Sequence, residues 1–250
     1  MTETENRAMN RFKGLFPVSK PIIAMLHFAG DNHQQRVDRA IDEMHLYAEE
    51  GVDGVIFENY HGEIGDIEVA LDKTRHEELP LIQGINLLGS AEYSYTLANW
   101  HNLSFIQFDN ILNSGLLRDH YATLRRTLSR ISTFGGVRFK YQPETGRTLE
   151  ADIREGMSLY DVIVTTGNAT GQETSIKKLR EFRQHLQNFP FVVGAGVTLE
   201  NVTEQLKYTD GAIVGSYFKI NWETLNPVDR SRVRDFMQAV KEARTAKELV

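Results

Sequence analysis

Four ionisable residues, His27, Glu58, Asp109 and Lys140, each close a short apolar segment of the sequence. Carboxyl groups in this position can serve as general acid or base, and a lysine ammonium can stabilise an enolate or an oxyanion. Unpaired charge is costly inside a protein, so Glu58 and Asp109 would also be suitable partners for Lys140 and Arg138. The pattern therefore predicts a proton-transfer site, or else an internal layer of salt bridges that only fills the protein.

Two other chemistries use the same residues. A buried lysine such as Lys140 can form a Schiff base, as in aldolases, although nothing in the sequence singles this out. His27, Glu58 and Asp109 could together hold a divalent metal, but no HxH or HExxH spacing supports that arrangement. We therefore predict a site without a cofactor, with a metal as the alternative.

Polar uncharged and basic side chains close other apolar segments and would orient a substrate. Arg138 and Lys140 are two residues apart, as are Gln107 and Asp109, so on a strand each pair would face one side of the sheet. The segment 165–174 is rich in Thr, Gly and Asn and could bind sugar hydroxyls or a second phosphate, or close over the substrate as a lid. The expected substrate-binding residues are Asn59, Asn86, Arg138, Thr166 and Asn168.

Other candidates lie just beyond these segments. Arg147, in the polar stretch 141–147, is a possible anion ligand, and His61 could reach the same site from the end of the second segment.

Glycine clusters replace polar side chains at the ends of the last apolar segments. Small residues allow a ligand to approach the main chain, and free backbone N–H groups suit a phosphate dianion. Tight turns alone would also explain these glycines. The predicted phosphate-binding residues are Gly167, Gly171, Gly194, Gly196, Val197, Gly215 and Ser216.

The elements that must position these residues are eight apolar, β-branched segments at intervals of about 25 to 30 residues. They begin at residues 22, 54, 81, 104, 136, 162, 191 and 211, and helical periodicity lies between them. A doubly wound fold has the same alternation, but its GxGxxG motif is missing. We therefore predict a single-domain (β/α)8 TIM barrel over residues 1–250. Residues 1–20 should form a short N-terminal capping helix, with Phe12, Leu15 and Phe16 over the barrel floor.

Composition narrows the functional classes. The 250 residues are 41% hydrophobic and 25% charged, as in a soluble globular protein. With no cysteine, a disulfide framework, a thiolate metal site and a cysteine nucleophile are excluded. The net charge of −6 argues against nucleic acid or anionic lipid as partners. No apolar segment is long enough to cross a bilayer and the start is polar, so we expect a cytoplasmic protein.

Several segments, in order along nearly the whole chain, resemble the BtpA/SgcQ family. They include Pro21–His27, Gly51–Asn59, Thr165–Gly171, Val193–Asn201 and Ala212–Lys219, with Asn226–Val233 near the end. The resemblance implies a TIM barrel related to phosphate-binding barrels such as phosphoribosylanthranilate isomerase. One family member is described as a photosystem I biogenesis factor, and another lies in a sugar-transport gene cluster.

This chain departs from better-known members after His27, where residues 28–33 replace a proline- and glycine-rich pattern. Residues 135–141 also differ from the usual valine-Lys-His pattern, although Lys140 is retained. Lys140, Glu58 and the glycine clusters are the positions that the resemblance carries over.

We expect an enzyme that acts on a phosphorylated sugar or nucleotide-like molecule, as an isomerase, epimerase or lyase using acid–base chemistry. The alternatives are an N-glycosidase or nucleoside-processing hydrolase, and a non-enzymatic biogenesis factor. Barrels of this kind often form oligomers, so we expect a homo-oligomer, with Tyr93, Tyr95 and Trp100 as exposed aromatic side chains.

Overall fold

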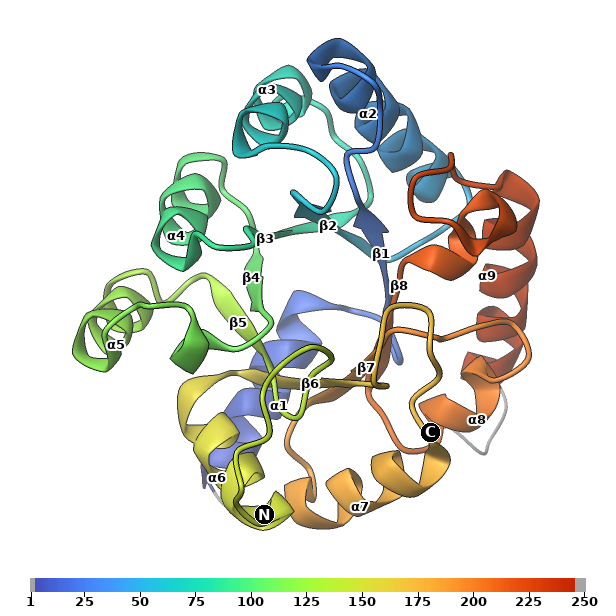
Figure 1. Ribbon diagram of the computed structural model, residues 1–250. Helices are drawn as coiled ribbons and strands as arrows, with labels where there is room; N and C mark the ends of the chain where they lie inside the picture. Colours follow the sequence, from blue (N-terminus) through green and yellow to red (C-terminus); the bar gives the residue numbers. More distant parts are fainter. Residues whose placement is uncertain (1–2, 246–250) are drawn as a thin grey trace.

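Eight parallel strands close into a barrel in the computed structural model, which describes residues 3–245 (Figure 1). Each strand pairs with the next along the chain, and β1 pairs with β8 through Ile22 and Ala212 and through Ala24 and Val214. The strands are β1 Ile22–Leu26, β2 Gly54–Glu58, β3 Ile82–Asn86, β4 Phe105–Phe108, β5 Ser132–Gly136, β6 Val162–Thr166, β7 Phe191–Gly194 and β8 Gly211–Val214.

Helices surround this barrel, and one further helix lies behind it in the view of Figure 1. The α-helices are α1 Glu3–Leu15, α2 His33–Glu49, α3 Ile64–Thr74, α4 Ala91–Trp100, α5 Arg118–Thr127, α6 Leu149–Leu159, α7 Ile176–Leu186, α8 Val202–Leu206 and α9 Arg230–Thr245. Short 3₁₀ helices are η1 Ile111–Asn113, η2 Ser216–Phe218 and η3 Ile220–Trp222. The predicted single-domain TIM barrel is confirmed. Of the predicted domain span 1–250, residues 1–2 and 246–250 lie outside the described part.

Local sequence explains why these elements form. Asn32 caps α2 by accepting a hydrogen bond from the Gln35 amide, and apolar residues at helical spacing bury one side of that helix. Along β1, alternate residues such as Ile23 and Met25 pack inside the barrel, while their neighbours pack against the outer helices. The core is therefore two layers, one within the barrel and one between strands and helices.

The N-terminal helix α1 closes one end of the barrel, as predicted. Phe12 and Phe16 are buried, and their rings lie 6.2 Å from those of Phe134 and Phe105 respectively. Leu15 is partly buried beside them. Helix α1 does not cover the opposite end of the barrel, where the strands end, and a functional site is expected there.

The predicted fifth strand, which began at Gly136, is wrong. The strand is Ser132–Gly136, and the chain turns away after it because Arg138 and Tyr141 adopt positive φ angles of 48° and 59°. The strand was missed because its glycines weaken the β signal. A Cβ on Gly135 would lie 2.1 Å from the Tyr160 ring, so this close packing requires glycine.

In residues 3–245, every helix is too short or too polar to span a lipid bilayer.

Candidate active site

A narrow cavity opens at the carboxyl ends of the strands, where TIM barrels place their active sites. His27, Glu58, Asp109 and Lys140 all line it, together with Gln107 and Thr166. Its free volume is about 50 Å³. The four ionisable residues predicted from the sequence are therefore brought together, three from the ends of β1, β2 and β4 and Lys140 from the loop after β5.

The two carboxyl groups share one amide. Asn86, the last residue of β3, donates from Nδ2 to Glu58 Oε1 at 2.8 Å and to Asp109 Oδ1 at 3.2 Å. Burial, and then the nearby Asp109 charge, raises the pKa of Glu58 to about 8, against the opposing effects of Lys140 and Asn86. Burial also raises the pKa of Asp109. Glu58 thus carries a proton at neutral pH and can donate it.

His27 is a neutral residue of this site. Burial lowers its pKa well below the usual value, and the positive charge of Lys219 adds to the effect. The 3.8 Å between His27 Nε2 and Glu58 Oε2 therefore separates two neutral groups at pH 7 rather than an ion pair. Within the described residues, His27 Nδ1 and Gln107 Oε1 are buried and lack hydrogen-bond partners. Both are therefore unsatisfied polar atoms of residues that line the cavity.

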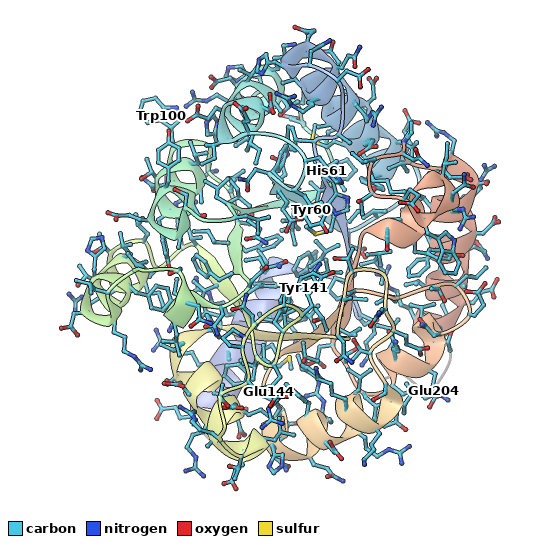
Figure 2. The ribbon with its side chains drawn as sticks, viewed as in Figure 1. Tyr60, His61, Trp100, Tyr141, Glu144 and Glu204 are labelled. Atoms are coloured by element: carbon cyan, nitrogen blue, oxygen red, sulfur yellow. The ribbon has the colours of Figure 1, made fainter. Side chains whose placement is uncertain are left out.

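Lys140 lies under the β6–α7 loop, residues 167–175. Its Nζ donates to Thr170 Oγ1 at 2.9 Å and stands 5.8 Å from the ring centres of both Tyr60 and Tyr141. The Thr170 amide donates to the Tyr141 hydroxyl at 3.0 Å. Figure 2 shows Tyr60 and Tyr141 over the central opening of the barrel. These contacts hold the loop across the mouth of the cavity.

The backbone of Lys140 is fixed as well. Its amide donates to Thr166 Oγ1 at 2.6 Å, so the last residue of β6 positions the lysine. Among the described residues, no ion pair within 4.0 Å joins Lys140 to Glu58 or Asp109. The ammonium group is thus close to the carboxyl groups electrostatically without being neutralised by direct contact.

The predicted phosphate-binding residues divide into two groups. Gly171, Gly194, Gly215 and Ser216 line the cavity. Gly167, Gly196 and Val197 are buried and lie outside its lining. A Cβ on Gly196, where φ is +62°, would meet the carbonyl carbon of Gln172 at 2.2 Å. Gly196 therefore allows the β6–α7 loop to pack against the end of β7.

Arg138 and Asn59 do not face the cavity. Because Arg138 is not on a strand, the expected common face of Arg138 and Lys140 is wrong: Arg138 Nε donates to Asp152 Oδ2 at 3.0 Å, on the outer side. Asn59 is occupied by the backbone of Leu88, whose amide donates to Asn59 Oδ1 at 2.7 Å. Asn168 is exposed and lines a separate groove outside the barrel mouth.

The expected pairing of Gln107 and Asp109 on one face agrees with the contact between Gln107 Nε2 and Asp109 Oδ1 at 3.5 Å. His61 reaches the mouth, as Figure 2 shows, and its Nε2 lies 2.8 Å from Thr224 Oγ1. Of the aromatic residues expected on the surface, Trp100 is 66% exposed and points outward in Figure 2, whereas Tyr95 is buried beneath α4. The expected exposure of Tyr95 is wrong.

The alternative of a metal site finds no support in the geometry. Within residues 3–245, no three His, Cys, Asp or Glu side chains are grouped closely enough to bind one ion. Asn86, an amide, stands between Glu58 and Asp109 where a metal site would need direct convergence of the carboxylates.

Sequence reasoning missed one buried ion pair near this site. Lys219 follows η2, and its Nζ lies 2.6 Å and 2.7 Å from the two carboxylate oxygens of Glu43 on α2. Both side chains are buried, and the Val228 amide also donates to Glu43. The sequence signal was a lysine within an otherwise apolar segment, which burial requires to be paired.

The fold and this cavity define a TIM-barrel protein in which a group of titratable residues lines one cavity at the carboxyl ends of the strands. The chain belongs to the BtpA family, which matches residues 18–242. An uncharacterised protein of Methanocaldococcus jannaschii is 28% identical, with 86% of this chain and 93% of that protein covered. The photosystem I biogenesis protein BtpA of Synechocystis is 24% identical, with 93% and 92% covered.

Solved structures of enzymes share the fold. N-(5′-phosphoribosyl)anthranilate isomerase from Pyrococcus furiosus matches with a TM-score of 0.59 and 16% identity, over 89% of this chain and 99% of that one. A 4-hydroxy-2-oxoglutarate aldolase matches with a TM-score of 0.60 and 15% identity, over 93% and 98%. At these identities the similarity concerns the fold, so function must be argued from the site.

Proposed function

We propose that the protein is an enzyme that moves a proton next to a carbonyl group of a phosphorylated sugar or nucleotide-like substrate, as an isomerase, epimerase or lyase. The observation that carries the proposal is the pair Glu58 and Asp109, bridged by Asn86, in which burial keeps a proton on Glu58. Two carboxyl groups held in different protonation states can act as acid and base in one reaction.

Each residue has a role in this chemistry. Asp109 removes a proton from the carbon beside the carbonyl, and the electron pair moves onto the carbonyl oxygen. The Lys140 ammonium stabilises the negative charge of that enolate. For an isomerase, Glu58 donates its proton to that oxygen, which gives an enediol. Asp109 then delivers its proton to the former carbonyl carbon while Glu58 takes the proton of the hydroxyl on the neighbouring carbon, so both carboxyl groups return to their starting states. Neutral His27 and Gln107 orient the polar groups of the substrate through their unpartnered buried atoms.

The phosphate group would lie opposite the carboxyl groups, against Gly171, Gly194, Gly215 and Ser216. Backbone amides that no Cβ screens can donate to phosphate oxygens at this end of a TIM barrel. The cavity holds only a few water molecules, since one water needs roughly 10–15 Å³. A sugar phosphate is larger, so the β6–α7 loop must release Thr170 from Lys140 and Tyr141 to admit it.

The test is a screen for solvent proton exchange. The protein is incubated in D₂O with a panel of sugar phosphates and nucleotides, and deuterium incorporation at carbon is followed by NMR. We expect exchange with at least one phosphorylated compound, and a loss of at least about 100-fold in Glu58→Gln and Lys140→Met. Lys177→Met, on the outer face of α7 where the side chain is 86% exposed, is the matched control.

The proposal fails if thermal unfolding is shifted by neutral sugars but by no phosphorylated compound, because a ligand that binds the native state must raise its stability. It also fails if exchange persists unchanged in Glu58→Gln.

A further inference from the structure

A second, larger groove lies beside the candidate active site. It runs between residues 138–149 and the β6–α7 loop, has a free volume of about 620 Å³, and is called the outer groove here. Phe139 and Lys140 line both the outer groove and the cavity in the barrel mouth. A molecule that reaches past Lys140 would therefore pass from one space to the other.

The outer groove contains a lysine without a carboxylate partner. Lys178, in the first turn of α7, donates from Nζ to the carbonyl oxygens of Arg138 at 2.9 Å and Thr166 at 2.7 Å. Among the described residues, no carboxylate lies within 4.0 Å of this ammonium group. Burial, together with the positive charge of Arg138, lowers the pKa of Lys178 to about 8. A positive charge held in this way lacks a counter-ion.

The other charged groups that face the groove do not supply that counter-ion. Arg138 and Arg147 share one carboxylate, Asp152, at 3.0 Å and 3.2 Å, and Arg147 also pairs with Glu155 at 2.7 Å. Glu144 and Glu181 also line the groove, against the four cations Arg138, Lys140, Arg147 and Lys178. Lys140 and Lys178 are therefore the cations of this groove that have no carboxylate within 4.0 Å among the described residues.

We propose that the outer groove binds a second anionic group of the substrate, a phosphate or a carboxylate, with Lys178 as its main ligand and Arg147 beside it. This inference rests on the proposed function, because the first phosphate and the reacting carbon are assigned to the barrel mouth. While the β6–α7 loop covers the mouth, the mouth is too small for a whole sugar phosphate, whereas the outer groove has more than ten times its free volume. The substrate class is thus a molecule with an anion at each end, its reactive centre lying near Lys140.

The experiment compares three probes by isothermal titration calorimetry at low salt. Ribose 5-phosphate carries one phosphate, ribulose 1,5-bisphosphate carries two, and 3-phosphoglycerate carries a phosphate and a carboxylate. We expect at least one of the two-anion probes to bind wild-type protein about tenfold more tightly than ribose 5-phosphate. Which of them gains shows whether the second anion is a phosphate or a carboxylate.

Substitutions assign the gain to the groove. Lys178→Met should abolish the tenfold difference and leave the affinity for ribose 5-phosphate unchanged, while Lys177→Met, one residue away and exposed, should change neither. Arg147→Gln should reduce the difference in part, and it serves as the test if Lys178→Met does not fold. Far-ultraviolet circular dichroism establishes that each variant is folded.

A mouth variant, Ser216→Asp, separates this inference from the proposed function. If Ser216→Asp weakens all probes while Lys178→Met and Arg147→Gln change none, the groove proposal is overturned and the proposed function stands. If Lys178→Met lowers the affinity of the two-anion probes while Ser216→Asp changes nothing, the groove binds anions but the phosphate site in the mouth is wrong. Binding of no probe by wild-type protein contradicts both.

Discussion

At the scale of single residues, protonation is governed by burial. Glu58 ends a strand inside the barrel, where its carboxylate would lose most of its hydration and would face the Asp109 charge. The Asn86 amide is positioned to hydrogen-bond both carboxyl groups, so neither needs a cation in direct contact. The same desolvation keeps His27 neutral, and the site therefore carries less charge than its residue types indicate.

The raised pKa of Glu58 makes the stability of the protein depend on pH. The pKa of Glu58 rises from 4.5 to about 8 on folding, so the native state keeps a proton that the unfolded chain releases above pH 4.5. Stability from this group is complete below pH 4.5 and is lost as the pH rises towards 8, at about 1.4 kcal/mol per pH unit. Glu58→Gln removes the titration, so it should be more stable than wild type by roughly 3 kcal/mol near pH 7 and little different at pH 4.5.

The measurement is urea unfolding of both proteins between pH 4.5 and 8.5. Glu144→Gln, on the exposed outer loop seen in Figure 2, is the control and should show no such divergence. A constant difference between Glu58→Gln and wild type across this range would show that Glu58 is ionised in the native state.

At the scale of elements, the β6–α7 loop depends on one backbone position at the end of β7. Gly196 has a left-handed backbone, and the carbonyl of Gln172 occupies the place of a side chain. Gly89 has a similar φ of +79°, but a Cβ added there would meet no heavy atom of the described residues within 4 Å. A comparison of substitutions at these two glycines therefore distinguishes the cost of backbone strain from the cost of a steric clash.

We expect Gly89→Ala to cost about 1 kcal/mol, from the positive φ alone, and Gly196→Ala to cost about 2 kcal/mol more as the loop is displaced. Urea unfolding gives both values, and limited proteolysis should cut the β6–α7 loop faster in Gly196→Ala only. Equal costs in the two variants would mean that the loop does not rest on Gly196.

The buried pair Glu43 and Lys219 joins α2 to the segment after β8. Glu43→Gln leaves the Lys219 ammonium buried without a counter-charge, which should destabilise the protein by about 3–5 kcal/mol. The double variant Glu43→Leu with Lys219→Met removes both charges and should recover most of that loss, because apolar side chains of similar size replace the pair. Thermal unfolding of the three proteins tests this, and a double variant as unstable as Glu43→Gln would contradict it.

The order of strands and helices was predictable, and with it the meeting of Glu58, Asp109 and Lys140, because strand ends converge in a closed parallel barrel. The bounds of the fifth strand were not predictable. Ser132–Gly136 has few β-branched residues, and the chain after it resembles a strand more closely. The positive φ angle at Arg138 turns its side chain away from the site, and no local sequence pattern predicts that angle. The packing of the β6–α7 loop against Gly196 depends on a contact with Gln172, and the spacing of these two residues in the sequence does not predict that contact.

At the scale of the whole molecule, the buried aromatic cluster and the candidate active site lie at opposite ends of the barrel. Phe12 of α1 and Phe16 directly after it close the amino-terminal end, and the titratable groups lie at the carboxyl ends of the strands. Substitutions at one end should therefore leave the other unaffected.

Phe16→Ala removes a ring packed against Phe105 and should cost about 3–5 kcal/mol in unfolding free energy without changing the affinity for ribose 5-phosphate. Lys140→Met should lower that affinity and leave the unfolding free energy within about 0.5 kcal/mol of wild type. Lys13→Ala, exposed on α1 three residues before Phe16, is the control for both measurements. A change in affinity in folded Phe16→Ala would show that the two ends are coupled.

The pairing of β1 with β8 also has a consequence for synthesis on the ribosome. One flank of Ile22–Leu26 finds its neighbour only when Gly211–Val214 has emerged. At typical rates of translation this takes on the order of ten seconds or more. During that interval an apolar strand has an open edge, which is a hazard for aggregation and a target for chaperones. The first strand to be made is among the last to gain both neighbours.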